Sequence, residues 1–184
     1  MVSDYKEILS DSAKGMKRSA IRELLKLTQK PEIISFAGGL PAKESFPLEQ
    51  LQEICAEVIA TDGAAACQYG STEGVPELLE ILAQRYRDQG LSYVTKENIT
   101  IITSSQQGLD TVGKIFLNRG DKYICELPSY LGAIGAFNSY GGIGVGIPQD
   151  EQGMSAVELE KTLAEMKAKG EKPKFIYLIP DFQN

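Results

Sequence analysis

Short apolar runs alternate with helix-length segments along the second half of the chain, and this alternation limits the fold more than any other feature. The runs have the β-branched and aromatic content of buried strands and lie at residues 99–103, 122–126, 143–147 and 174–180. Strands that alternate with helices form βαβ units, whose crossovers produce a mainly parallel sheet. The sequence therefore predicts an α/β fold.

Helical segments fill the spaces between these runs. The clearest begins near Pro76 and ends before Gly90, and another starts with Ser155 and Glu158 at the spacing of a capping box. A helix from Pro47 to about residue 61 is also predicted. The remaining predicted elements are helices at 16–29, 105–118, from Pro128 to about 139, and 155–170, and a short strand at 33–37.

The composition excludes two classes of partner. The chain has 184 residues, with 19 Lys and Arg against 25 Asp and Glu, so its net charge is −6. An acidic chain without a basic run is a poor match for a nucleic-acid backbone or an anionic lipid surface. No stretch approaches the length of an apolar membrane span. We therefore expect neither a nucleic acid nor a membrane as a partner.

Histidine is absent, which excludes Ser-His-Asp catalysis and the commonest zinc sites, and no metal is expected. The three cysteines, Cys55, Cys67 and Cys125, form no CxxC pair and have mostly apolar or small neighbours. They are predicted to be buried free thiols of a protein in the reducing cytoplasm. The first residues contain no apolar signal segment, which agrees with a cytoplasmic location.

The run at 99–103 stops at two hydroxyls and an amide, where the next helix begins. Ser104, Ser105 and Gln106 occupy this junction. In parallel α/β sheets, ligands bind outside the carboxyl ends of the strands, where helix N–H groups favour anions. These side chains therefore suit a phosphate group. The alternative is that Ser104 or Ser105 only caps the helix.

Two further strand ends carry groups that a flat ligand could use. Tyr130 follows the strand at 122–126, and Gln183 and Asn184 follow the strand at 174–180. An anion site, an aromatic ring and an amide at one sheet edge suit a phosphorylated heteroaromatic cofactor. NAD is disfavoured because no strand is followed by the pattern G-x-G-x-x-G.

The chain resembles the N-terminal part of a fold-type I aminotransferase that depends on pyridoxal 5′-phosphate. Within that superfamily it is most similar to the branch of 2-aminoadipate (LysN-type) and kynurenine aminotransferases. The matching stretches follow one another in order: SAIRELLKLTQKPEIISFAGGLPAKESFP, CQYGSTEGVPELLEILAQRY, TSSQQGLDTVGKIFLNRGD, ELPSYLG and FIYLIPDFQN.

The resemblance implies a three-layer sandwich with a mainly parallel sheet, the large domain of this superfamily in incomplete form, after an N-terminal segment of the small domain. Residues 1–46 would form that segment and residues 47–184 the first part of the large domain. It also implies roles for cofactor-binding residues. Ser105 and Gln106 match the phosphate loop, Tyr130 the ring that stacks on the pyridine, and Asn184 the partner of the phenolic oxygen. A core tyrosine is the alternative for Tyr130.

Four positions match the substrate site of the family. Gly39 resembles a backbone position beside the substrate, although a plain turn would also use glycine. Tyr69 resembles a tyrosine supplied to the neighbouring subunit, which implies a homodimer with shared active sites. Ser19 and Arg22 share a helix face and match substrate-recognition residues, Arg22 facing a side-chain carboxylate. A solvated arginine is the alternative for Arg22.

The resemblance implies a transaminase that moves an amino group from an α-amino acid to a 2-oxo acid such as 2-oxoglutarate. The donor would be 2-aminoadipate or another amino acid with an acidic or long side chain. The family's Schiff-base lysine matches no position of this chain, so no catalytic lysine is assigned and the fragment is expected to be inactive alone. Two alternatives stay open, a cofactor-binding sensor domain of a transcriptional regulator and a non-catalytic scaffold.

Overall fold

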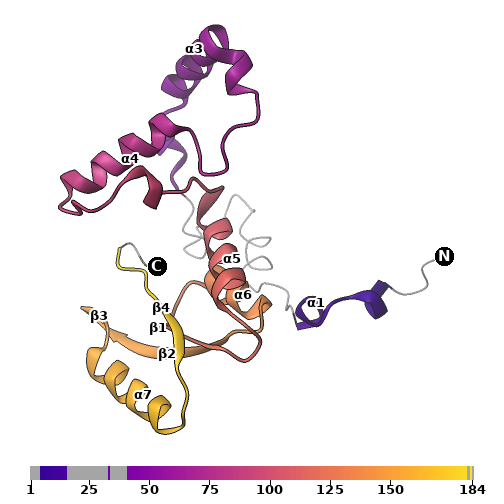
Figure 1. Ribbon diagram of the computed structural model, residues 1–184, viewed down its shortest axis with the longest axis vertical. Coiled ribbons are helices and arrows are strands. Elements are labelled where there is room, and N and C mark those ends of the chain that lie inside the picture. The colour runs from indigo at the N-terminus through magenta and orange to yellow at the C-terminus, as the bar shows by residue number, and fades with distance from the viewer. Residues whose placement is uncertain (1–4, 16–32, 34–40, 182, 184) are drawn as a thin grey trace. The chain divides into compact units, whose positions relative to one another are not determined.

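The computed structural model describes residues 5–15, 33, 41–181 and 183. The chain divides into two compact units (Figure 1). The first comprises Met1–Ala37 with Thr103–Asn184, and the second comprises Gly38–Ile102. The domain boundary predicted after residue 46 stays a prediction.

The first unit contains a four-stranded sheet with the order β3-β2-β1-β4. The central strand β1 is parallel to β2 and to β4, whereas the short β3 is antiparallel to β2. The strands are β1 (Lys122–Leu127), β2 (Ile143–Asp150), β3 (Gly153–Met154) and β4 (Pro173–Tyr177). The chain is therefore part of an α/β domain with a mostly parallel sheet, as its alternating pattern predicts.

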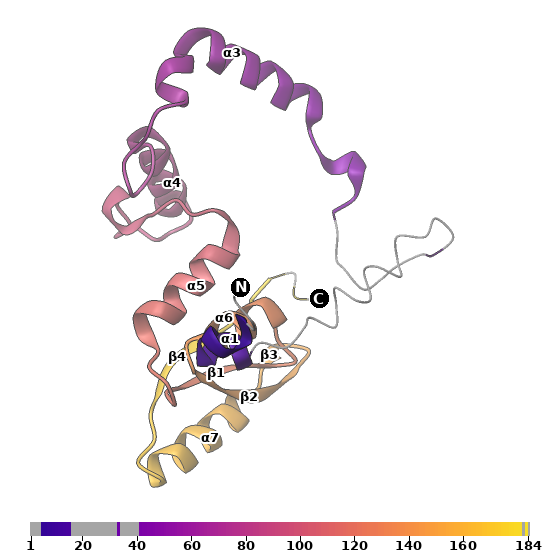
Figure 2. The same ribbon diagram turned by 90° about the vertical axis from the view of Figure 1, so that its right-hand side faces the viewer.

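Helices lie on both sides of this sheet. Figures 1 and 2 show α5 and α6 on one side and α7 on the other. Ser155 caps α7, because its hydroxyl accepts the N–H of Glu158 at 3.4 Å, as the capping-box spacing predicts. The helices among the described residues of this unit are η1 (Tyr5–Ile8), α1 (Asp11–Gly15), α5 (Ser104–Phe116), α6 (Leu131–Ser139) and α7 (Ala156–Ala168).

Aromatic rings form the core between α6 and the sheet. Phe137 of α6 is 1% exposed and meets the rings of Tyr123, Phe175 and Tyr177 edge to face, with centroids 5.0 to 5.6 Å apart. Tyr123 also stacks on Phe175 at 5.7 Å. Such contacts stabilise the fold beyond their buried area, by about 0.5–1.5 kcal/mol for each pair.

A glycine on β2 makes room for the largest of these rings. Gly144 pairs with Tyr123 across the parallel ladder, and a Cβ atom at Gly144 would lie 2.9 Å from the Tyr123 hydroxyl oxygen. A larger residue would push against the ring, so the glycine allows a tyrosine to lie flat between two strands. The Tyr123 hydroxyl donates to Asn138 Oδ1 at 3.0 Å, which satisfies its only donor.

The second unit is helical. In α4, Leu79 and Ala83 are buried, four residues apart on one face of the amphipathic helix that the sequence predicts. Gly74 has a φ of 126° and lies against Ile101, whose N–H donates to the carbonyl of Glu73 at 2.7 Å. The helices are η2 (Lys43–Ser45), α3 (Leu48–Ala66), α4 (Pro76–Asp88) and η3 (Lys96–Asn98).

Residues 99–103 do not form the strand that their apolar content predicts. An extended segment becomes a strand only where a neighbour offers a hydrogen-bonding edge. No described strand pairs with this segment, and Ile101 and Ile102 remain 39% and 43% exposed. The predicted helix at 16–29 and the predicted strand at 33–37 lie largely or wholly outside the described residues.

The prediction of buried thiols is wrong for two of the three cysteines. Cys125 on β1 is buried, but Cys55 and Cys67 are exposed, and all three are free. The reason is that α3, which carries Cys55 and ends just before Cys67, buries none of its residues in the structure. Apolar neighbours in the sequence therefore do not ensure burial.

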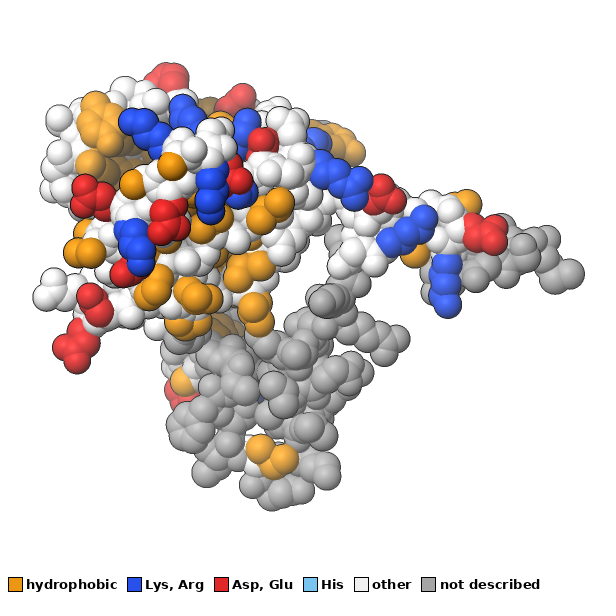
Figure 3. All heavy atoms as spheres, turned by 90° about the horizontal axis from the view of Figure 1, so that it is seen from below, with side chains coloured by type: hydrophobic (Ala, Val, Ile, Leu, Met, Phe, Trp, Pro, Cys, Tyr) orange, Lys and Arg blue, Asp and Glu red, His pale blue; other side chains and the backbone are white. Residues whose placement is uncertain are grey.

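Three properties of the described part of the chain bear on its partners. None of its helices is long and apolar enough to cross a membrane. Within the same residues, no group of three or more His, Cys, Asp or Glu side chains could hold a metal ion. Figure 3 shows that basic and acidic side chains are interspersed on the face in view, so this face has no extended field of one sign.

Burial of Tyr123 predicts a loss of stability at high pH. Burial raises the pKa of this phenol from 10.0 to about 12, so the unfolded chain releases the proton before the folded chain does. The contribution of Tyr123 to the free energy of unfolding is complete below pH 10. It falls as the pH rises through about 12, by up to about 1.4 kcal/mol per pH unit. Urea unfolding across this range measures the slope.

Tyr123→Phe is the control for this prediction. Phenylalanine keeps the ring packing but has no proton to lose, so the variant should lose less stability over the same pH range than the unaltered protein. Parallel loss in both proteins would show that Tyr123 is not the group responsible.

Candidate functional site

The carboxyl end of β1 leads directly into the N-terminus of α6. Tyr130 is the N-cap residue of α6 and is 47% exposed. Its ring lies over Gly132, where an added Cβ would come within 2.5 Å of two ring carbons. The absence of a side chain at Gly132 therefore allows the half-exposed ring to lie across the first turn of α6.

The N-terminus of α5 has an unusual backbone. Thr103 is the N-cap residue, and its N–H donates to Gln107 Oε1 at 2.5 Å. Ser104 has a φ of 61°, in the left-handed region that non-glycine residues rarely occupy. Such conformations destabilise the folded state by about 1–3 kcal/mol and are common at ligand sites. The backbone places the N-cap at Thr103, and the alternative interpretation, in which Ser104 or Ser105 only caps the helix, stays open.

One hydrogen bond joins the starts of the two helices. Gln106 Nε2 donates to the carbonyl oxygen of Gly132 at 3.4 Å, and α5 packs beside α6. Ser105 and Gln106 thus lie near the turn on which Tyr130 rests. Neither helix has an acidic residue in its first turn, so nothing there offsets the positive end of either helix dipole. This combination suits an anionic group beside a flat ring.

The hydroxyl of Ser129 adds a polar atom to the same loop. Its Oγ is buried and has no hydrogen-bond partner among the described residues. A buried hydroxyl without a partner costs about 1–3 kcal/mol, so such atoms usually have a role in binding or structure. Ser129 directly precedes Tyr130, and the sequence pattern did not single it out.

Sequence reasoning also missed a half-buried phenol, Tyr177, and a buried carboxylate, Glu126, near Tyr130. Tyr177 ends β4, and its pKa is raised by burial and by the neighbouring Tyr130, Glu126 and Cys125. Glu126 is 4% exposed, and its carboxylate accepts the N–H of Ile179 at 3.0 Å. A charged residue inside an apolar run was the available signal for Glu126, since buried carboxylates are rare unless they have partners.

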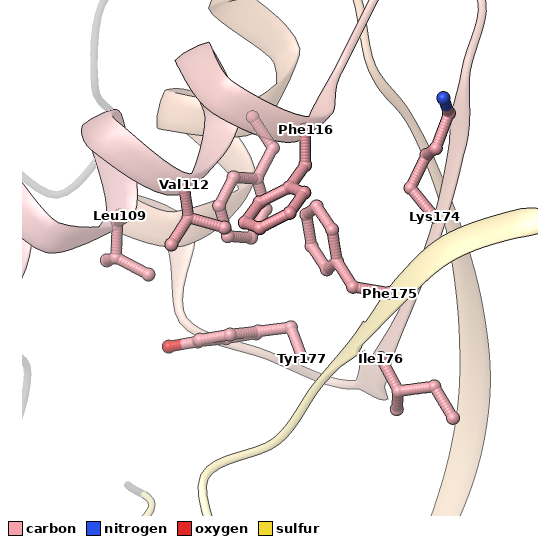
Figure 4. A pocket seen from close by; sticks show the side chains of 8 residues that line it. Leu109, Val112, Phe116, Lys174, Phe175, Ile176 and Tyr177 are labelled. Carbon is pink, nitrogen blue, oxygen red and sulfur yellow. The ribbon is translucent and has the colours of Figure 1, made fainter. Parts of the chain in front are cut away.

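An apolar hollow of about 390 Å³ opens between α5 and β4. Figure 4 shows the side chains that line it, and Lys174 is the only charged residue among them. None of Ser105, Gln106 and Tyr130 lines this hollow. The hollow shares Tyr177 with the surroundings of Tyr130 but does not include the predicted cofactor contacts.

The structure does not test the other predicted site residues. Tyr69 lies in the second unit and is 98% exposed, with its N–H donating to Gln68 Oε1. Its predicted role in a neighbouring subunit stays a prediction. Four predicted contacts lie outside the described residues: Ser19, Arg22, Gly39 and Asn184.

The sequence profile of the class I and II aminotransferases matches residues 31–179, which is more than half of the chain. The chain belongs to this family. Among curated relatives, it is 45% identical to aromatic-amino-acid aminotransferase 1 of Thermococcus litoralis and 44% identical to the 2-aminoadipate transaminase of Thermus thermophilus, with 98% of the chain aligned in both cases. These alignments cover 43% of each relative, so the chain spans under half of their length.

Solved structures of aminotransferases have the same fold over almost the whole chain. The kynurenine aminotransferase of Pyrococcus horikoshii, solved with PMP, is 40% identical, with a TM-score of 0.86 over 99% of this chain and 45% of that one. The α-aminoadipate aminotransferase LysN of Thermus thermophilus, solved with a phosphopyridoxyl-leucine, is 41% identical, with a TM-score of 0.82 over 98% of this chain and 42% of that one. The resemblance inferred from the motifs is thereby confirmed at the level of the family.

The residues present fit the pyridoxal phosphate cofactor of this family. Tyr130 is half-exposed, Gly132 leaves room for its ring, and the buried Ser129 hydroxyl has no hydrogen-bond partner in the described part of the chain. Gln106 joins the first turn of α5 to this place.

Replacing Gly132 by alanine should move the Tyr130 ring. The new methyl group would overlap the ring, and because Tyr130 is half-exposed the ring can swing outward at little cost to the fold. We expect the dissociation constant for pyridoxamine 5′-phosphate to rise about 3- to 10-fold, as expected for the loss of one aromatic stacking contact. Calorimetric titration of the protein expressed from its whole reading frame measures the change.

Gly135→Ala is the matched control on the same helix. No atom lies within 4 Å of the position that its Cβ would occupy. The Gly135 variant should bind as the unaltered protein does, and equal binding by the Gly132 variant would contradict the role assigned to the ring.

Proposed function

We propose that the chain supplies part of the cofactor and substrate site of a pyridoxal phosphate-dependent aminotransferase. The observation that carries the proposal is the hydrogen bond between Gln106 and Gly132, which joins the N-terminus of α5 to the turn on which Tyr130 rests. In this proposal the chain is the first part of a three-layer large domain, residues 47–184, after a small-domain segment, residues 1–46.

Each cofactor contact has a defined task. The hydroxyl of Ser105 and the first N–H groups of α5 donate to the phosphate, and Gln106 keeps that helix end against α6. The Tyr130 ring stacks on the pyridine face, and the Asn184 amide donates to the phenolic oxygen of the ring. The cofactor, when bound, supplies the electron sink for the transfer of the amino group.

Substrate recognition falls to residues of the N-terminal half. Arg22 pairs with a side-chain carboxylate of the amino donor, helped by Ser19, and the backbone at Gly39 borders the substrate. Tyr69 reaches the active site of a second subunit, so the working enzyme is a homodimer, and its three free cysteines suit the cytoplasm. The donor is 2-aminoadipate or a similar acidic or long amino acid, and 2-oxoglutarate is the acceptor.

Absorbance spectroscopy tests this function directly. The protein expressed from its whole reading frame should carry the visible absorbance of a bound pyridoxal phosphate. Addition of 2-aminoadipate should remove this band, and 2-oxoglutarate should restore it. A colourless protein that takes up no pyridoxal phosphate would refute the proposal.

Replacing Arg22 by alanine tests the substrate class. The loss of a charge-assisted bidentate pair should lower kcat/KM for 2-aminoadipate about 10- to 100-fold, because such bonds contribute about 1.5–3 kcal/mol. The value for an aromatic donor should change much less. Arg18→Ala, in the same segment, is the control, and equal losses for both donors would contradict a role in carboxylate recognition.

A further inference from the structure

Glu126 is a buried carboxylate that the proposed chemistry does not use. It lies near the end of β1, between β2 and β4, and is 4% exposed. Removing a carboxylate from water is costly unless hydrogen bonds replace its hydration, so its partners indicate its role. The partner in the structure is the N–H of Ile179, at 3.0 Å from Oε2.

This hydrogen bond extends the pairing of β1 and β4 beyond their backbone ladder, with a side chain as the acceptor. The backbone ladder between β1 and β4 includes the pair Cys125 and Tyr177, and β4 ends there. Two residues later, the N–H of Ile179 donates to the Glu126 side chain instead of to a backbone carbonyl. The carboxylate therefore holds the chain that leaves β4 beside the end of β1.

A second hydrogen bond holds the same segment. Gln183 Nε2 donates to the carbonyl oxygen of Pro128 at 3.0 Å. The same oxygen accepts Gln149 Nε2, from β2, at 2.8 Å. Residue 179 is thus fixed to β1, just before the loop that carries Tyr130, and residue 183 is fixed to the loop itself.

We infer that Glu126 is a positioning residue that holds the segment after β4 against the cofactor-binding loop. This inference rests on the proposed function, in which Asn184, the residue after Gln183, is a cofactor contact. The carboxylate acts through Ile179 and touches no ligand itself. Its task is to order this segment before the cofactor arrives, so that binding does not have to supply the ordering.

Hydrogen exchange and cofactor binding test the inference together, in the protein expressed from its whole reading frame. In Glu126→Leu, the amide of Ile179 should exchange at least about tenfold faster, because a hydrogen bond to a charged acceptor is lost. The dissociation constant for pyridoxamine 5′-phosphate should rise about tenfold as the segment loses its order. Glu126→Gln, which keeps an acceptor oxygen, should restore most of both properties.

Two half-buried positions keep the test decisive if the leucine variant does not fold. Gln183→Leu removes the hydrogen bond to Pro128. It should also weaken the binding of pyridoxamine 5′-phosphate and speed amide exchange in residues 178–183. Gln149→Leu removes the other bond to this carbonyl, from β2, and should leave exchange at Ile179 near the value of the unaltered protein, since Gln149 does not hold the segment after β4.

The outcomes separate the inference from the function on which it rests. Suppose that the unaltered protein binds pyridoxamine 5′-phosphate. The positioning role alone is then overturned if Glu126→Leu leaves exchange at Ile179 unchanged, or if exchange becomes faster while the affinity stays the same. If the unaltered protein binds no pyridoxamine 5′-phosphate, the proposed function fails first and the positioning role fails with it.

Discussion

The rings of Phe137 and Tyr123 meet edge to face 5.0 Å apart, and this contact fixes α6 on the sheet. Phe175 and Tyr177 of β4 close around the same phenylalanine, so one side chain joins a helix to two parallel strands. Because α6 is short, its position on the sheet also determines where its N-terminus lies. The location of Tyr130 at the edge of the sheet therefore depends on packing several residues away from it.

The site combines groups that would be ordinary if they were separate. A helix N-terminus, a half-exposed tyrosine and a buried serine hydroxyl each occur in many proteins without a ligand. Here the amide of Gln106 reaches the carbonyl of Gly132, and the ring of Tyr130 lies over that same glycine. The proximity of these groups is what distinguishes a candidate cofactor site from a set of helix caps.

Local patterns predicted local structure well. The Ser155 cap, the amphipathic face of α4 and the strands at 122–126 and 143–147 all follow from nearby residues. The strand at 99–103 did not form, because a strand also needs a neighbour that the pattern cannot specify. Glu126 and Ser129 were missed for a similar reason. Their partners, or the lack of them, depend on segments far along the chain.

The two ends of the sheet are held by different forces. At the carboxyl end, the Pro128 carbonyl accepts two side-chain amides, so both of its lone pairs are used. At the amino end, partly exposed ion pairs join Lys122 to Glu171 and Lys174 to Asp121, beside the irregular register that follows Lys122. Dissolved ions screen exposed charges far more than they weaken amide hydrogen bonds. Rising ionic strength should therefore weaken the contacts at the amino end of the sheet more than those at the end that carries Tyr130.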